Sequence, residues 1–292
     1  MNFKLPSKIK ELKLNINNSN NIKLFIKRED LIHDIVSGNK WRKLNYNFKY
    51  IKEKKIKKIL SFGGAYSNHL HALSWLAKKN NIKSFGLVRG CKLSIENPTL
   101  SFCKKNKMDL FFLDRSTYRN NKYNNPIFKK IIKSEENIFV IPEGGFNEFG
   151  IKGCEEIMNE VNEHYDIICC SIGSGCTAVG IIKSLKFNQS FLGFSSFKNN
   201  SQIKNIISEK VKTMNWEINS EYNFGGFGQV NDELKKFIKD FKNTYAIMLD
   251  PIYTSKLFFG LFDMISKNKL PKDSRILVLH TGGLQGLQGV NL

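Results

Sequence analysis

A lysine that follows Gly-Asn is the first residue in the chain with a clear potential for covalent chemistry. Lys40 lies in residues 37–44, SGNKWRKL, at the start of a predicted helix. In a cleft between domains, partial burial and neighbouring cations would lower the pKa of its amine and favour a covalent bond to a carbonyl carbon. Most lysines are solvated on the surface, so this segment alone leaves both interpretations open.

A glycine-rich loop at residues 171–180, SIGSGCTAVG, follows the apolar run DIICC. Backbone N–H groups of such a loop, together with the next helix N-terminus, form a phosphate site. The loop also fits the dinucleotide pattern G-x-G-x-x-A, which requires an acidic residue about 20 positions further on. No Asp or Glu occurs between Asp166 and Glu209, so a simple phosphate is favoured over NAD. A purely structural strand-to-helix turn stays open.

The segment FGGAYSNHLH, residues 62–71, offers a second set of anion donors. Its paired glycines allow close approach of a ligand, and Ser67 and Asn68 at a helix start could supply hydroxyl, amide and backbone donors. The alternative is ordinary helix capping by either residue. His69 and His71 are two positions apart and diverge on a helix, which argues against a shared metal ion.

Two C-terminal motifs complete the candidate set. They are DPIYTSK, residues 250–256, and HTGG, residues 280–283, after the apolar run RILVL. Tyr253 is a candidate for proton transfer and Thr254 for a hydrogen bond to a ring nitrogen, although a core tyrosine beside a turn proline is equally common. With PEGG at residues 142–145, the set is much more specific than any one motif.

Short apolar runs that end in glycine-rich turns alternate with segments of helical spacing throughout the chain; the runs are residues 57–64, 84–90, 137–145 and 166–172. Continuous apolar strands joined by helical crossovers predict an α/β fold with mainly parallel, twisted sheets and helices on both faces. Ligands bind at the carboxyl ends of such strands, where the glycine loops occur. Residues 116–125, STYRNNKYNN, are predicted as a surface loop.

Composition limits the classes of function. The net charge of +20 suggests a nucleic-acid partner, but the lysines are spread along the chain and no nucleic-acid-binding signature accompanies them, so solvated helix faces are favoured. The six cysteines form no CxxC pair, so neither a metal site nor disulfides are expected. We find no signal peptide and no run of about 18 apolar residues, and expect a cytoplasmic protein with no membrane partner.

Taken in order, these motifs resemble the pyridoxal 5'-phosphate (PLP) dependent family that contains 1-aminocyclopropane-1-carboxylate (ACC) deaminase and D-cysteine desulfhydrase. The resemblance runs from KRED at residues 27–30 to HTGG. It implies that Lys40 binds the cofactor as an imine, that Asn68 contacts the cofactor ring oxygen, and that Ser67 takes the substrate carboxylate and assists proton transfer. It also implies that the glycine-rich loop binds the cofactor phosphate, through Gly173, Ser174, Gly175, Cys176 and Thr177.

The resemblance also implies a fold like that of the tryptophan synthase β subunit, usually in a homodimer. Residues 1–44 and 141–292 are then expected to form a larger domain that anchors the cofactor. Residues 45–140 are expected to form a smaller mobile domain. These boundaries are approximate.

Within the family, the C-terminal motifs indicate the substrate. ACC deaminases typically carry Tyr-Glu and HLGG, whereas D-cysteine enzymes carry Tyr-Thr and HTGG, as here, and His69 after Ser-Asn agrees. The residues expected at the substrate are Ser67, Asn68, His69, Phe227, Thr281 and Gly282. Phe227 stands where the family has a tyrosine, which removes a hydroxyl. We therefore expect a lyase that converts D-cysteine to pyruvate, sulfide and ammonia; the alternatives are an ACC deaminase or a PLP-binding protein with little catalysis.

Overall fold

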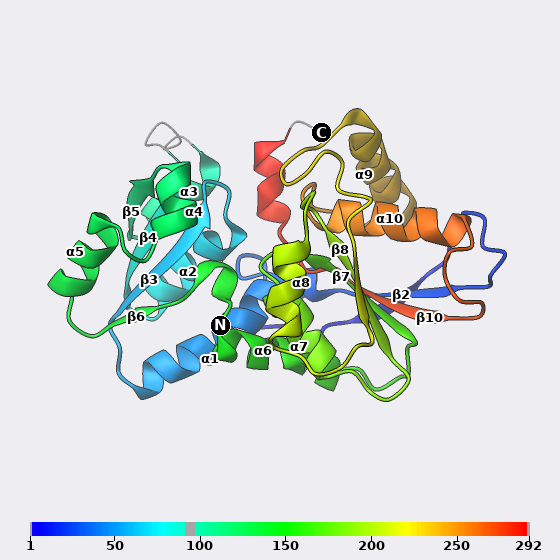
Figure 1. The fold of residues 1–292 in the computed structure, drawn as a ribbon, viewed down its shortest axis with the longest axis horizontal. Helices are drawn as coiled ribbons and strands as arrows, with labels where there is room; N and C mark the ends of the chain where they lie inside the picture. Colours follow the sequence, from blue (N-terminus) through cyan, green and yellow to red (C-terminus); the bar gives the residue numbers. More distant parts are fainter. Residues whose placement is uncertain (1, 91–96, 291–292) are drawn as a thin grey trace.

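The computed structural model describes residues 2–90 and 97–290, and their strands form two separate sheets. Figure 1 shows the smaller sheet in one part of the molecule and the larger sheet in the other, with the blue helix α1 running from below the smaller sheet to the middle of the molecule. Strands and helices alternate along the chain, as the sequence pattern predicts. The predicted α/β fold with mainly parallel sheets is confirmed.

The larger sheet has six strands in the order β1-β2-β10-β7-β8-β9. Only its β1–β2 pair is antiparallel within the described residues. The strands are β1 (Ile9–Leu12), β2 (Lys23–Lys27), β7 (Ile167–Ile172), β8 (Ser190–Ser195), β9 (Trp216–Asn219) and β10 (Arg275–Leu279). The helices beside it are α6 (Glu148–Asn159), α7 (Cys176–Lys183), α8 (Ser201–Ser208), α9 (Asp232–Tyr245) and α10 (Thr254–Ser266).

Helices cover both faces of this sheet because its strands are apolar on both sides. Ile276 and Val278 of β10 pack in one core with α9 and α10, whereas the alternate residues Leu277 and Leu279 pack in another with α6 and α7. Side chains of a strand point alternately to opposite faces, so the even-numbered residues of β10 are buried on one face of the sheet and the odd-numbered residues on the other. The sheet is therefore the central layer of three.

The smaller sheet has four parallel strands in the order β5-β4-β3-β6. The strands are β3 (Lys58–Gly64), β4 (Lys83–Arg89), β5 (Met108–Leu113) and β6 (Ile138–Val140). The helices are α1 (Asn39–Glu53), α2 (Asn68–Lys79), α3 (Pro98–Lys105), α4 (Arg115–Asn121) and α5 (Pro126–Ser134). Two cores flank it, one with α1, α2 and α3 and the other with Tyr118 of α4 and Ile131 of α5.

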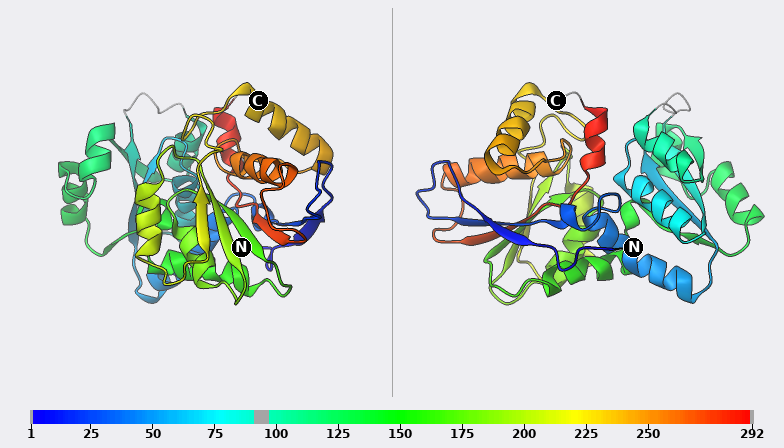
Figure 2. Two further views of the ribbon diagram at one scale, coloured as in Figure 1. Left: turned by 45° about the vertical axis from the view of Figure 1, so that its right-hand side comes forward. Right: turned by 180° about the vertical axis from the view of Figure 1, so that it is seen from behind.

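Short 3-10 helices occur beside the glycine motifs: η1 (Glu29–Leu31), η3 (Glu143–Gly145) and η4 (Leu284–Gly289). Seen from behind in Figure 2, the red η4 lies between the two parts of the molecule. The division into domains 1–44 with 141–292 and 45–140 stays a prediction. No helix in the described ranges is long and apolar enough to cross a membrane.

The prediction of a surface loop at residues 116–125 is wrong for residues 116–121, which are helical, whereas residues 122–125 form a turn. Helix α4 covers Arg115–Asn121, because the carboxylate of Asp114, outside the predicted segment, caps the backbone N–H groups of Ser116 and Thr117. Tyr118 is buried and fixes the helix against the small sheet. Many Asn residues in the segment suggested a loop, but one cap and one buried aromatic ring outweigh that preference.

Candidate active site

The helix that carries Lys40 begins on a tight contact with the HTGG turn. Gly38, its N-cap, has a φ of +60°, and a Cβ there would lie 2.0 Å from the carbonyl oxygen of Thr281. The same carbonyl accepts the backbone N–H of Asn39 at 3.3 Å. Gly282 in turn leaves room for Ser37. Only glycine at 38 permits this approach, which joins the SGNK and HTGG motifs into one structure.

Lys40 is partly buried, and its Nζ donates to the side-chain oxygen of Asn39 at 2.5 Å. Burial and the nearby ammonium of Lys43 lower the pKa of Lys40 from 10.5 to about 7, against the opposing charge of Asp250. About half of the Lys40 side chains are then uncharged at neutral pH. A neutral amine is the form that bonds to a carbonyl carbon, as the sequence motif predicts.

Asn39 connects Lys40 to the glycine-rich loop. Its Nδ2 donates to the hydroxyl of Thr177 at 3.0 Å, while its Oδ1 accepts from Lys40. Thr177 is in the first turn of α7, so one carboxamide bridges α1 and α7. Sequence reasoning missed Asn39 as a site residue, although its place directly before the lysine is a usable signal.

The glycine-rich loop follows β7 at the carboxyl end of the strand. The hydroxyl of Ser174 is buried without a hydrogen-bond partner in the described residues, and a Cβ on Gly144 would lie 2.8 Å from it. Gly175 has a φ of +88° and caps α7. The thiol of Cys176 donates to the carbonyl of Gly145 at 3.5 Å. A buried hydroxyl without a partner is unfavourable in itself and fits a site that receives an acceptor oxygen.

Lys43 supplies a positive charge for that site. The residue is only 4 % exposed, yet its ammonium has no ion pair or hydrogen bond in the part of the chain that the structure describes. It is one helical turn from Lys40, and it lowers the pKa values of Lys40 and His69. A buried cation without a counter-ion favours an anionic ligand. These residues therefore fit the phosphate group of PLP. The sequence analysis did not select Lys43, although its i+3 spacing from Lys40 was visible.

The DPIYT segment forms a compact cap at the start of α10. The carboxylate of Asp250 accepts the backbone N–H groups of Ile252, Tyr253 and Thr254, and the hydroxyl of Thr254 donates to it at 2.6 Å. The predicted contact of Thr254 with a ring nitrogen stays a prediction: donating to that nitrogen would require the hydroxyl hydrogen to leave Asp250, whereas accepting from it would not. Asp250 itself acts on the pKa of Lys40, so it lies close to the reacting amine.

The ring of Tyr253 lies against the glycine-rich loop, with its hydroxyl 3.6 Å from where a Cβ on Gly173 would be. Burial, Asp250 and Glu143 raise the pKa of Tyr253 well above its usual range. The phenol is therefore protonated at neutral pH and can donate a proton but not accept one. Its hydroxyl forms no hydrogen bond to another described residue, which leaves it available to a ligand.

Ser67 and Asn68 begin α2 beside the cleft. The hydroxyl oxygen of Ser67 accepts the backbone N–H of Leu70 at 3.2 Å, so the capping interpretation is confirmed for Ser67. Its hydroxyl hydrogen is still available for a ligand. The side-chain oxygen of Asn68 accepts from Gln285 of η4 at 2.7 Å.

His69 is buried behind Gly145, with its ring fixed in one tautomer. The hydroxyl of Ser61 donates to the carbonyl of Ile141 at 2.7 Å, so it must accept from His69 Nε2–H, 2.9 Å away. His69 Nδ1 is left without a partner among the described residues. Burial and the two nearby ammonium groups lower the pKa of His69 to about 3, so the ring is neutral. Its contact with substrate stays a prediction.

Phe227 is 42 % exposed and stacks on Phe197, with ring centroids 5.2 Å apart. Its ring lies 5.9 Å from that of Tyr253, which places it at the same end of the large sheet. Beneath it, the buried ammonium of Lys256 donates to the carbonyls of Asn223 and Gly226 at 2.8 Å each. One side chain of α10 therefore holds residues 223–228, a second loop, which carries Phe227.

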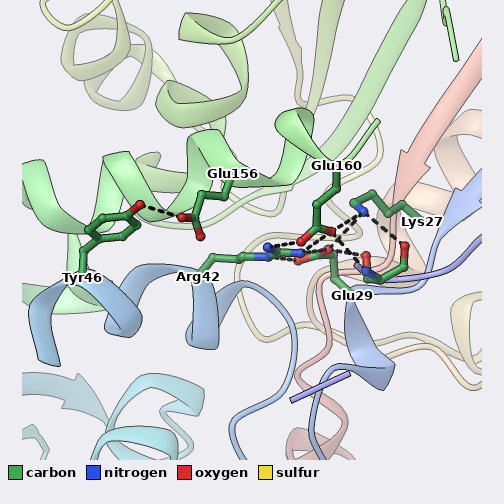
Figure 3. A network of polar contacts seen from close by, with 7 residues as sticks. Lys27, Glu29, Arg42, Tyr46, Glu156 and Glu160 are labelled. Atoms are coloured by element: carbon green, nitrogen blue, oxygen red, sulfur yellow. Dashed lines mark hydrogen bonds and ion pairs between the residues drawn. The ribbon is translucent and has the colours of Figure 1, made fainter. Parts of the chain in front are cut away.

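A buried ionic network anchors the first turn of α1 (Figure 3). Arg42 forms paired hydrogen bonds with the carboxylate of Glu29 and with that of Glu160, all at 2.7–2.8 Å. Lys27 donates to Glu160 at 2.8 Å and lies 3.7 Å from Glu29. Two cations therefore balance two anions in the interior. The network ties α1 to the end of β2 and to the residue after α6, and so fixes the helix that presents Lys40.

Two units built mainly of parallel strands, with an amine of lowered pKa and residues at the strand ends that fit an anion, are the arrangement that a PLP-dependent enzyme requires. Residues 11–282 match the model of the family described as pyridoxal-phosphate dependent enzyme, and the chain belongs to this family. The predicted family and cofactor are confirmed.

Two relatives and one solved structure are similar to this chain over most of its length. A Thermotoga maritima protein provisionally named 1-aminocyclopropane-1-carboxylate deaminase is 29% identical over 285 residues, which are 90% of this chain and 89% of that protein. The mitochondrial bifunctional D-cysteine desulfhydrase/1-aminocyclopropane-1-carboxylate deaminase of Arabidopsis thaliana is 28% identical over 92% of this chain and 74% of its own. A crystal structure of an ACC deaminase homologue matches with a TM-score of 0.84 and 26% identity, covering 98% of this chain and 92% of the other.

We predict that Arg42→Met lowers the free energy of unfolding by about 3–5 kcal/mol, because it leaves Glu29 and Glu160 buried with too little positive charge. Denaturant titration of both proteins measures the difference. Glu156→Gln is the control, since Glu156 also joins the same two helices by accepting from Tyr46 at 2.6 Å, outside the charged network. Its loss is expected to be only about 1 kcal/mol. Equal losses in the two variants would show that the network does not anchor α1.

We also predict that covalent capture of PLP by the cofactor-free protein depends on pH around neutrality. The reactive form is the uncharged amine, and the pKa of Lys40 is lowered to about 7. The initial rate of capture, trapped with borohydride, should rise roughly tenfold from about pH 6 to about pH 8 and then level off. Lys40→Arg should capture none at this position. A rate that still rises steeply above about pH 9 would mean that the pKa of Lys40 is not lowered.

Proposed function

We propose that this chain is a PLP-dependent lyase that acts on D-cysteine and releases pyruvate, hydrogen sulfide and ammonia with consumption of one water. The observation that carries the proposal is the Lys40 amine, whose pKa is lowered to about 7, in the same site as the buried hydroxyl of Ser174, which has no hydrogen-bond partner among the described residues. The relatives named for D-cysteine and ACC support the substrate class. We retain a homodimer and a cytoplasmic location as predictions.

The cofactor would be held by groups on both sides of the cleft. Ser174, Thr177 and the ammonium of Lys43 are suited to its phosphate, and Lys40 to its carbonyl carbon. The free N–H donors of Asn68 are suited to its ring oxygen. When bound, PLP withdraws electrons from the substrate α-carbon and so makes loss of the Cα proton easier.

The side chains of the cleft provide the proton transfers. The Nζ of Lys40 is the base that takes the Cα proton, because it is uncharged in about half of the molecules near pH 7. The phenol of Tyr253 stays protonated, so its hydroxyl can donate a hydrogen bond to the departing sulfur and stabilise the charge that develops there. Ser67, at the helix start, binds the substrate carboxylate with its hydroxyl hydrogen and the first N–H groups of α2.

ACC deamination to 2-oxobutanoate and ammonia is the second candidate, favoured by the name of the Thermotoga maritima relative. ACC has no Cα hydrogen, so Lys40 would have no α-proton to remove. Ring opening would instead depend on Ser67 and Tyr253 at the ring carbons. The phenyl ring of Phe227 beside Tyr253 offers no second hydroxyl for that step, and this supports D-cysteine as the preferred substrate.

A substrate panel tests the proposal. We expect 2-oxo acid from D-cysteine and β-chloro-D-alanine at a higher kcat/KM than from ACC, D-serine or L-cysteine, with sulfide formed from D-cysteine in equal amount. The measurements are pyruvate or 2-oxobutanoate by coupled reduction and sulfide by a colorimetric assay. A higher kcat/KM for ACC would establish the second candidate. Bound PLP with no turnover of any panel member would establish a PLP-binding protein with little catalysis.

Tyr253→Phe is expected to lower kcat for D-cysteine by about tenfold or more, because the hydrogen-bond donor to the departing sulfur is lost while the ring keeps its packing on Gly173. KM should change little. β-Chloro-D-alanine, whose chloride leaves without protonation, should be much less affected, and this comparison isolates the role of the hydroxyl. Tyr222→Phe, which removes a hydroxyl that donates to Asp263 away from the cleft, is the control. An equal loss for both substrates would argue against a hydrogen bond from Tyr253 to the departing sulfur.

A further inference from the structure

The short helix η4 crosses from the large sheet to the helices of the small sheet. It follows β10 through the HTGG turn and contacts α3. A Cβ on Gly289, at its far end, would lie 2.6 Å from the ring of Tyr66, so η4 also lies directly on the segment before α2. Figures 1 and 2 show the red η4 beside both parts of the molecule.

The carboxamide of Gln285 is the polar centre of this contact. Its Nε2 donates to Asn68 Oδ1 at 2.7 Å and to the carbonyl oxygen of Tyr66 at 3.2 Å. Its Oε1 accepts the hydroxyl of Thr99 at 2.7 Å. Three bonds from one side chain therefore reach α2, α3 and the segment between β3 and α2. The sequence analysis did not select Gln285 because no motif includes it.

These bonds determine which end of the Asn68 amide faces the cleft. A backbone carbonyl can only accept, so the NH₂ group of Gln285 must face Tyr66. The same NH₂ group then takes the oxygen of Asn68, and Asn68 Nδ2 points the other way, with no hydrogen-bond partner among the described residues. A Cβ on Gly283 would lie 3.0 Å from Nδ2 and 3.7 Å from the carboxyl carbon of Asp250, so Nδ2 is directed toward the HTGG turn, on the side where Asp250 lies.

We infer that Gln285 is a positioning residue, which holds the carboxamide of Asn68 so that its N–H donors face the ring oxygen of the bound cofactor. A ring oxygen that carries negative charge requires a donor, and a reversed amide would present a second oxygen to it. This inference rests on the proposed contact between Asn68 and PLP. Gln285 acts through Asn68 and does not itself touch the cofactor.

Gln285→Glu tests the inference with little change in shape. The carboxylate still accepts from Thr99 but repels the oxygens of Tyr66 and Asn68, so the Asn68 amide should turn over. We expect the Kd for PLP, measured by fluorescence titration of the cofactor-free protein, to rise roughly tenfold, in line with the loss of one hydrogen bond to a charged group. The visible absorption maximum of bound PLP should also shift.

Gln288→Glu is the matched control, because it makes the same charge change on an exposed side chain of η4. It should leave the Kd and the spectrum as in the wild type. In an Asn68→Ala background, Gln285→Glu should add no further loss of affinity. Two results would overturn the inference. One is that Gln285→Glu has the same Kd and spectrum as the wild type. The other is that Gln285→Glu lowers PLP affinity as much in the Asn68→Ala background as in the wild-type background. Should Gln285→Glu fail to fold, Gln285→Met replaces it, and its Kd for PLP is compared in the wild-type and Asn68→Ala backgrounds in the same way.

The outcome is separable from that of the proposed function. A wild-type protein that does not capture PLP on Lys40 contradicts the proposed function, whatever the variants do. A wild-type protein that captures PLP, with Gln285→Glu indistinguishable from Gln288→Glu, contradicts only the role of Gln285.

Discussion

The buried charges of Lys27, Glu29, Arg42 and Glu160 are the constraint on which the rest of the site depends. Removing four charges from water is costly, and it is compensated here because each carboxylate receives several hydrogen bonds from a guanidinium or ammonium group. Such a network forms only when β2, α1 and the end of α6 have the correct mutual distances. The first turn of α1 is fixed because these hydrogen bonds form only at defined distances and angles, and this matters more than the net energy of the network. Lys40 is two residues from Arg42 and inherits that position.

A second level of organisation arises from glycine. Gly38 and Gly282 let two turns approach more closely than any side chain would permit, and Gly144 leaves space beside Ser174. Backbone atoms and polar side chains therefore come close together around Lys40 and Ser174. The positive charge at this site comes from the ammonium of Lys43, which forms no ion pair with a described residue, and in part from Lys40, whose pKa is lowered to about 7. The overall charge of +20 is of little relevance to this chemistry, because it is spread along the whole chain.

Much of the architecture was predictable from local patterns. Apolar runs that end in glycine turns correctly predicted β3, β4, β6 and β7 and the helices after them, because parallel strands buried on both faces have a continuous apolar sequence. Contacts between distant segments were not predictable. Arg42 and Glu160 are 118 positions apart, and Asn68 and Gln285 are 217 apart. The pKa of Lys40 depends on burial, which only the folded chain defines. The helix α4 was missed for a local reason: its cap, Asp114, lies just before the segment whose composition suggested a loop.

The anchoring of the Phe227 loop by Lys256 has a consequence for how substrate preference can change. Phe224, Gly225, Gly226 and Gly228 all have positive φ, a path that the sequence alone would leave poorly ordered. Lys256 holds that path through backbone carbonyls, and these two bonds do not depend on which side chain stands at position 227. A phenyl, a phenol or a smaller group can occupy the position on an unchanged backbone. The proposed contact of position 227 with substrate is thereby separable from the bonds that anchor its loop, and a single codon change would alter that contact while both anchoring bonds remain.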